Sequence, residues 1–168
     1  SITGNGTLNL TGSGPSAFVG CNYTSANCFS DSDGQINVAG ANLVFSNNVN
    51  NSFGTAALNL GPGCVLINNG DPGGPSTVTI GEVSGSGVLS DCNWSGGGAR
   101  VVTYIVGGRN TSATFSGYIQ DYLRATGINK VGTGSWTLTG SGLVNYSGPT
   151  TVSAGALIVG PGAFMVNS

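Results

Sequence analysis

The chain has 168 residues, of which 39% are hydrophobic, 6% are charged and 31 are glycine, and its formal net charge is −2. This length suits one domain with a real core, and the hydrophobic share argues against disorder. Four scattered basic residues form no patch that could neutralise phosphates, and no apolar run approaches the ~20 residues of a membrane-spanning helix. We therefore expect one folded domain over residues 1–168, with no nucleic-acid partner and no membrane insertion.

Short β-type runs alternate with glycine-centred turns along the chain. They lie at residues 36–38, 43–45, 77–80, 101–106, 112–115, 135–139, 150–152 and 156–159. Residues 4–14 are echoed by residues 132–142, with a third variant at 54–61. In these segments apolar and polar residues alternate, as in strands with one buried face, and the glycines supply the positive φ angles of tight corners.

Such short strands with frequent corners favour a parallel β-solenoid, in which each coil adds one strand to each of several sheets. The alternative is an immunoglobulin-like sandwich, which has longer strands and a Cys…Trp…Cys core pattern. Here Trp94 follows Cys92 by two residues, and Trp136 follows all four cysteines, so that pattern is absent. We predict an all-β, single-domain parallel β-solenoid.

Three segments depart from the rhythm of the strands and are predicted to be inserted loops. They lie at residues 20–34, 91–100 and 118–130. Solenoids carry such insertions on one flank, because a loop that leaves a corner does not disturb stacking. The segment 118–130 is the one place where the sequence could accommodate a helical turn.

Four cysteines occur, Cys21, Cys28, Cys64 and Cys92, and they allow three pairings. Their spacing is not of the zinc-binding CxxC type and the chain has no histidine, so we assign no metal site. We expect two disulfides, Cys21–Cys28 and Cys64–Cys92, which imply an oxidising location. Four buried free thiols are the alternative.

The sequence offers little for catalysis. Without histidine, the Ser-His-Asp and Cys-His arrangements are absent. The only local acidic pair, Asp31 and Asp33, would form either a calcium corner or an Asx-type turn before a strand. We therefore assign no catalytic residue and no cofactor. Five aromatic residues could form either a sugar-binding platform or stacks in the core: Tyr104, Tyr118, Tyr122, Tyr146 and Trp136.

Residues 114–119, 130–140 and 145–159 resemble, in order and spacing, the autotransporter-associated β-strand repeat of large secreted bacterial surface proteins. The resemblance extends over residues ~74–160 and is looser over residues 1–73. It implies a right-handed parallel β-helix displayed outside the cell as a stalk or passenger. Passengers of this family are often far longer and poor in cysteine, so the chain is either a piece of such a protein or a small protein of the same architecture.

Three functional hypotheses follow. The first is a non-catalytic fibre subunit, extracellular or on the cell surface after loss of a signal peptide, which stacks head to tail with copies of itself. The two ends of the solenoid carry apolar strands and no charged cap, and we expect the subunit contacts there, at Ile2, Leu8, Leu10, Leu157, Val159, Phe164 and Val166. The second is an adhesin or glycan-binding passenger fragment that uses the three loops. An enzyme acting on polysaccharide is a remote third.

Overall fold

The computed structural model describes residues 4–12, 18–21, 33–40, 42–46, 50–69, 75–91, 101–140 and 143–165. All the regular elements in these ranges are β-strands, and the strands within each sheet pair in parallel. The seven strands of the largest sheet, sheet I, are β1 (Thr7–Thr11), β3 (Gln35–Ala39), β6 (Ala57–Leu60), β9 (Glu82–Gly85), β12 (Ala113–Phe115), β15 (Ser135–Leu138) and β18 (Ala156–Val159).

Two further sheets of five strands complete most of the structure. Sheet II consists of β2 (Phe18–Cys21), β4 (Asn42–Ser46), β7 (Val65–Asn69), β10 (Val88–Ser90) and β13 (Tyr118–Gln120). Sheet III consists of β5 (Asn50–Ser52), β8 (Ser76–Ile80), β11 (Val101–Val106), β14 (Ala125–Lys130) and β17 (Thr150–Val152). A last pair joins β16 (Leu143–Val144) to β19 (Phe164–Met165).

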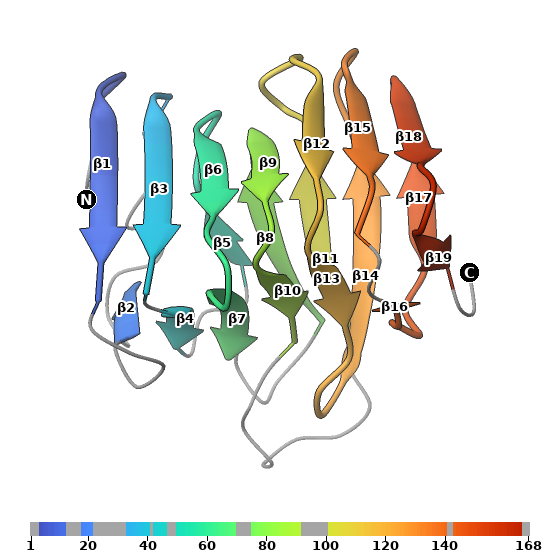
Figure 1. Ribbon diagram of the computed structural model, residues 1–168, viewed down its shortest axis with the longest axis horizontal. Helices are drawn as coiled ribbons and strands as arrows, with labels where there is room; N and C mark the ends of the chain where they lie inside the picture. The colour runs from blue at the N-terminus through green and yellow to red at the C-terminus, as the bar shows by residue number, and fades with distance from the viewer. Residues whose placement is uncertain are drawn as a thin grey trace.

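The chain visits sheets I, II and III in turn, as in β6, β7 and β8, and then begins the next coil in sheet I. The strands of successive coils therefore lie side by side along the long axis of the molecule, with β1 near one end and β18 near the other (Figure 1). This arrangement confirms the predicted all-β parallel β-solenoid.

The core consists of rows of side chains that point into the coil from equivalent positions. In sheet I one such row passes through Ile36, Leu58 and Val83, all buried. In sheet III Ile80 and Val106 are also paired and buried. Alternation of apolar and polar residues in the sequence places these side chains inside, since neighbouring residues of a strand point to opposite faces.

Glycine is required at the corner between sheets III and I. Gly132 has a φ of 71° and follows β14. A Cβ atom added there would lie 1.9 Å from the carbonyl oxygen of Gly107, the equivalent corner of the preceding coil. Stacked corners can approach this closely only without a side chain, which explains why glycines recur between the strands.

The three predicted loops have different outcomes. Segment 118–130 is not an inserted loop with a helical turn: it forms β13 and β14, joined by a corner at residues 121–124. Its polar and exposed residues suggested a loop because they lie at that corner. Residues 22–32 and 92–100, which make up most of the other two loops, lie outside the described residues.

Because the described ranges contain only strands, turns and bends, they include no helix capable of crossing a membrane.

Candidate functional site

The C-terminal end of the stack exposes apolar side chains. β17 and β18 are the last strands of sheets III and I, so no described strand covers their outer edges. Val152 and Val159 continue inward-facing rows and are 48% and 43% exposed, whereas their partners in the preceding coil, Lys130 and Leu138, are buried. Leu157, next to Trp136, is partly buried against the core. These positions are exposed because no described strand lies beyond β17 and β18.

The N-terminal end presents the opposite side of the same rows. In β1, Leu8 and Leu10 pack partly buried against the core, in register with Ile36 and Val38 of β3. β1 is the edge strand of sheet I, and nothing in the described part of the chain covers its outer edge. The inward-facing leucines at this end are therefore open on one side.

Backbone groups at the edge of β1 alternate in direction. Gly12 donates its N–H to the carbonyl oxygen of Ala39 at 3.0 Å, so the even-numbered residues bond to β3. In a parallel ladder the alternate residues direct their N–H and C=O groups to the other side. Thr7, Asn9 and Thr11 therefore direct theirs to the open edge.

The same reasoning gives the complementary pattern on β18. Gly160, just after the strand, donates to the carbonyl oxygen of Leu138 at 2.7 Å, so the even-numbered residues bond to β15. Leu157 and Val159 then direct their backbone groups outward. Each end of sheet I thus carries a ready-made parallel strand edge.

The remaining predicted contact residues are less informative. The backbone of Phe164 pairs with Leu143 between β19 and β16, at the C-terminal end. The side chain of Phe164 lies outside the described residues, as do Ile2 and Val166 entirely. Their role as contacts stays a prediction.

The structure does not contain the predicted Cys64–Cys92 disulfide, and the Cys21–Cys28 pairing stays a prediction. Cys64 is buried with a free thiol, which lies 3.5 Å from the carbonyl oxygen of Val38. Cys28, Cys92 and the side chain of Cys21 lie outside the described residues.

Asp91 binds the corner of the next coil, a role that the sequence did not reveal. Its carboxylate accepts hydrogen bonds from the backbone N–H groups of Tyr122 (3.0 Å), Leu123 (3.1 Å) and Arg124. Burial raises the pKa of Asp91 above its usual 3.8, while the three N–H donors oppose that shift. No local sequence pattern indicates this role, because the N–H donors and the carboxylate acceptor are more than 30 residues apart.

Lys130 performs a similar function at the corner between sheets III and I. It occupies an inward-facing position, is 1% exposed, and its Nζ donates to the carbonyl oxygens of Val131 (2.5 Å), Gly132 (3.1 Å) and Ala154 (3.4 Å). Burial lowers the pKa of this amine. Since Ala154 belongs to the next coil, Lys130 ties two successive corners together.

The five aromatic residues divide into two groups. Tyr104, Tyr146 and Trp136 are buried, and the single hydroxyl proton of Tyr104 is shared between the carbonyl oxygens of Ser90 (2.5 Å) and Leu66 (3.1 Å). Tyr118 and Tyr122 are exposed. The core interpretation is therefore correct for the first three, and only the two exposed tyrosines are available to a ligand.

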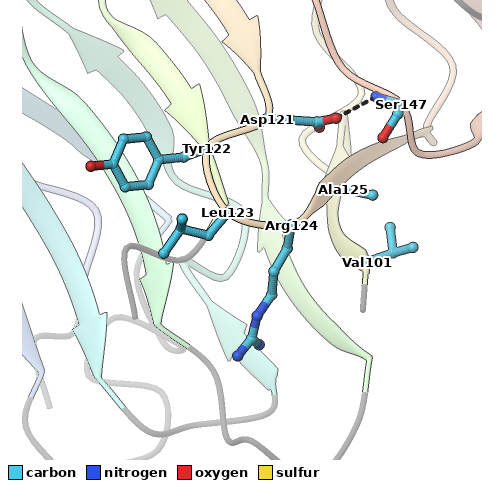
Figure 2. A pocket seen from close by; sticks show the side chains of 7 residues that line it. All are labelled: Val101, Asp121, Tyr122, Leu123, Arg124, Ala125 and Ser147. Atoms are coloured by element: carbon cyan, nitrogen blue, oxygen red, sulfur yellow. Dashed lines mark hydrogen bonds between the residues drawn. The ribbon is translucent and has the colours of Figure 1, made fainter. Parts of the chain in front are cut away.

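A surface pocket of about 500 Å³ opens at the corner between β13 and β14. Figure 2 shows the side chains that line it, with Asp121 turned toward Ser147. The backbone N–H of Ser147 donates a hydrogen bond to Oδ2 of Asp121 at 2.8 Å. The lining residues are Val101, Asp121, Tyr122, Leu123, Arg124, Ala125 and Ser147. A second pocket of about 260 Å³ shares Tyr122 and is also lined by Asn42, Val65, Ile67, Ser90, Asp91 and Gln120.

Among the described residues, each pocket is lined by one carboxylate. Asp121 and Asp91 lie in them, but the carboxylate of each accepts backbone N–H bonds, Asp121 from Thr126 (2.6 Å) and Ser147. Such carboxylates hold corners together and are poorly placed to transfer protons to a substrate. Among the described residues, no group of three acidic or cysteine side chains could hold a metal ion. Asp33 therefore belongs to no such group among the described residues. Asp31, its partner in the predicted calcium corner, lies outside the described residues.

Part of this solenoid matches a known protein family. Residues 128–159, from β14 to the end of β18, match the family model described as "Passenger-associated-transport-repeat". The matched residues form an autotransporter passenger-type β-helix repeat. The matched stretch lies within residues ~74–160, where the sequence resemblance was strongest, and it includes Lys130 and the Gly132 corner. Neither the curated proteins nor the solved structures gave a match to the chain.

This passenger repeat is a structural repeat, and its family implies a secreted or surface protein. The repeat ends at the open strand β18, so the matched segment includes the C-terminal edge described above.

Proposed function

We propose that the chain is a non-catalytic structural subunit of an extracellular or cell-surface fibre, in which passenger-type solenoids stack end to end. The C-terminal edge of one copy pairs with the N-terminal edge of the next. The observation that carries the proposal is that the two open edges of sheet I are complementary in both side-chain direction and backbone direction.

The register of the junction follows from the ladders within the molecule. Inward-facing residues pair with one another throughout sheet I, as Leu8 does with Ile36 and Trp136 with Leu157. Continuation of that rule sets Leu157 of one copy opposite Leu8 of the next, and Val159 opposite Leu10.

In this register the backbone groups also match. The outward N–H and C=O groups of Leu157 and Val159 meet those of Thr7, Asn9 and Thr11 in the next copy. The expected bonds include Asn9 N–H to the carbonyl oxygen of Leu157, and Val159 N–H to that of Asn9. A stack joined this way has one direction and does not close on itself, which produces a filament.

Burial of apolar surface supplies the driving force for the junction. Complete burial of an aliphatic side chain contributes ~1.5–3 kcal/mol, and half-exposed side chains contribute less. Val152 and Val159 are nearly half exposed, and Leu8, Leu10 and Leu157 have an uncovered side. Few charges oppose association, since only 6% of residues are charged.

A second candidate is a stalk or passenger segment with adhesive loops, in which further coils of a longer polypeptide cover the same edges. The repeat match over residues 128–159 favours this candidate as much as the first. The two differ in what covers β18: a second copy in the fibre, more of the same chain in the passenger.

Sedimentation velocity at rising concentration, followed by negative-stain electron microscopy, tests the fibre proposal. The wild type should form elongated species that persist at high salt, because apolar contacts and backbone bonds hold the junction. Leu157→Asp should remain a folded monomer, since it places a carboxylate in the junction.

Thr114→Asp is the matched control. Thr114 is exposed on β12, in the middle of the stack, so the same new charge lies away from both ends. This variant should assemble as the wild type does. A wild type that stays monomeric at high concentration, or a Leu157→Asp variant that assembles normally, would refute the fibre proposal.

A further inference from the structure

The corner between β13 and β14 has features of a ligand site that stacking does not use. Tyr122 and Leu123 are 65% and 51% exposed there, although both carry large apolar groups. The corner is rigid, because Asp91 holds the backbone N–H groups of residues 122–124. The two side chains are therefore presented to solvent by a fixed backbone.

Arg124 gives this corner a charged group without a complete set of partners. It is 7% exposed and lines the larger pocket, and its buried Nε–H has no hydrogen-bond acceptor. A buried donor left unpaired destabilises the folded protein, and more so when the group is charged. Because the Nε is buried, the guanidinium must turn into the pocket to meet an incoming carboxylate, which matches it in geometry and charge.

Tyr122 lines both pockets. A ligand long enough to enter both pockets would cross its exposed ring. The linings are polar as well as apolar, with Ser147 and Asp121 in one pocket and Ser90, Gln120 and Asp91 in the other. Both carboxylates already accept bonds from backbone N–H groups.

From this arrangement we propose that the corner binds an acidic oligosaccharide, with one sugar ring against Tyr122 and its carboxylate on Arg124. Hydroxyl groups of a sugar suit the polar lining, and the flat face of a sugar suits an exposed tyrosine ring. A peptide strand would instead pair with an open sheet edge, and those edges lie at the ends of the stack rather than at this corner.

Binding to an array that carries uronate-containing, sialylated and neutral glycans tests the proposal. The array is probed with the Leu157→Asp variant, so that the avidity of assembled copies does not raise the apparent affinity. If that variant still assembles, the fibre proposal fails, but the array still tests glycan binding. We expect binding to one or more carboxylate-bearing glycans and loss of that binding when the carboxylates are methyl-esterified. Binding to neutral glycans alone, or to none, would overturn the proposal.

Variants then locate the site. Tyr122→Ala should weaken binding about tenfold or more, as for loss of one stacked contact. Tyr118→Ala is the matched control, because Tyr118 is also exposed but lines neither pocket. Equal weakening by both tyrosine variants would contradict the site.

Arg124 is tested by charge. Arg124→Gln should abolish the preference for the acid over its methyl ester, and Arg124→Lys should retain part of it. Circular dichroism reports whether each variant is folded. If Arg124→Gln is unfolded, the partial preference expected for Arg124→Lys still tests the role of Arg124. A folded Arg124→Gln protein that still prefers the acid would refute the role of Arg124.

Discussion

The middle of the solenoid and its C-terminal end use the same rows of side chains with opposite outcomes. In sheet III, Val106 and Lys130 are 1% exposed, whereas the next residue of their row, Val152, is 48% exposed. In sheet I, buried Leu138 is followed by Val159, which is 43% exposed. Even a lysine is covered in the middle, while valines are uncovered at the end.

Position in the stack, rather than hydrophobicity, therefore decides which side chains are buried. Each inner coil is covered by its two neighbours, whereas among the described strands the coil of β17 and β18 is covered on one side only. The middle should accordingly determine the stability of the fold, and the end should determine what the molecule associates with.

The largest expected effect on stability comes from comparing two paired residues of sheet I, Trp136 in the middle of the stack and Leu157 at its C-terminal end. Trp136 is fully buried, donates its Nε1–H to the carbonyl oxygen of Val83 at 3.0 Å, and lies 6.1 Å from the ring of Phe115. Trp136→Ala should reduce the free energy of unfolding by ~3–5 kcal/mol. Urea titration followed by circular dichroism measures this loss.

Leu157, the partner of Trp136 in β18, is the comparison residue. Leu157→Ala should cost well under ~2 kcal/mol in the monomer, since one side of this residue is already open. Equal losses for the two variants would contradict the distinction between the middle and the end.

An intermediate effect is expected at the corner held by Asp91. In the wild type, the backbone N–H groups of the corner bond to both carboxylate oxygens of Asp91. Asp91→Asn leaves only one acceptor oxygen, so the free energy of unfolding should fall by ~1–3 kcal/mol. Glu82→Gln makes the same chemical change where the carboxylate accepts a bond from the exposed Thr111, and it should change stability little. Urea titration that finds Asp91→Asn as stable as Glu82→Gln would contradict the role of Asp91.

The smallest effect is a pH dependence at Lys130, the last covered residue of its row. Its pKa is lowered by burial from the ordinary 10.5, so the folded protein releases this proton before the unfolded chain does. Lys130 should therefore raise the free energy of unfolding as the pH rises from the lowered pKa of the folded protein toward 10.5, the pKa in the unfolded chain.

Lys130→Met provides the reference, because other titrations are common to both proteins and cancel. The stability of the wild type relative to this variant should increase with pH in that window, measured by urea titration at several pH values. A difference that is constant or decreases with pH would show that the amine is not buried as described.

Much of the fold could be predicted from the sequence because it depends on neighbouring residues. The alternation in residues 135–138 identified β15, the apolar β-type run at 156–159 identified β18, and the glycines beside them identified the corners. The rule is local, since one residue points inward and the next outward.

The corners could not be predicted in the same way, because they depend on contacts between coils. Asp91 and its three N–H donors are more than 30 residues apart, so the polar segment 118–130 suggested a loop instead of two strands. The predicted contact residues Leu157 and Val159 do lie at an open edge, whereas the pocket around Arg124 depends on the same undetected corner.

Cryo-electron microscopy of the concentrated wild-type protein tests the central claim most directly. The account predicts filaments in which β18 of one copy continues into β1 of the next as a parallel ladder, with the two strands ~4.8 Å apart and Leu157 opposite Leu8. Dispersed monomers at high concentration, or filaments joined through the sides of the solenoid with β18 uncovered, would contradict it.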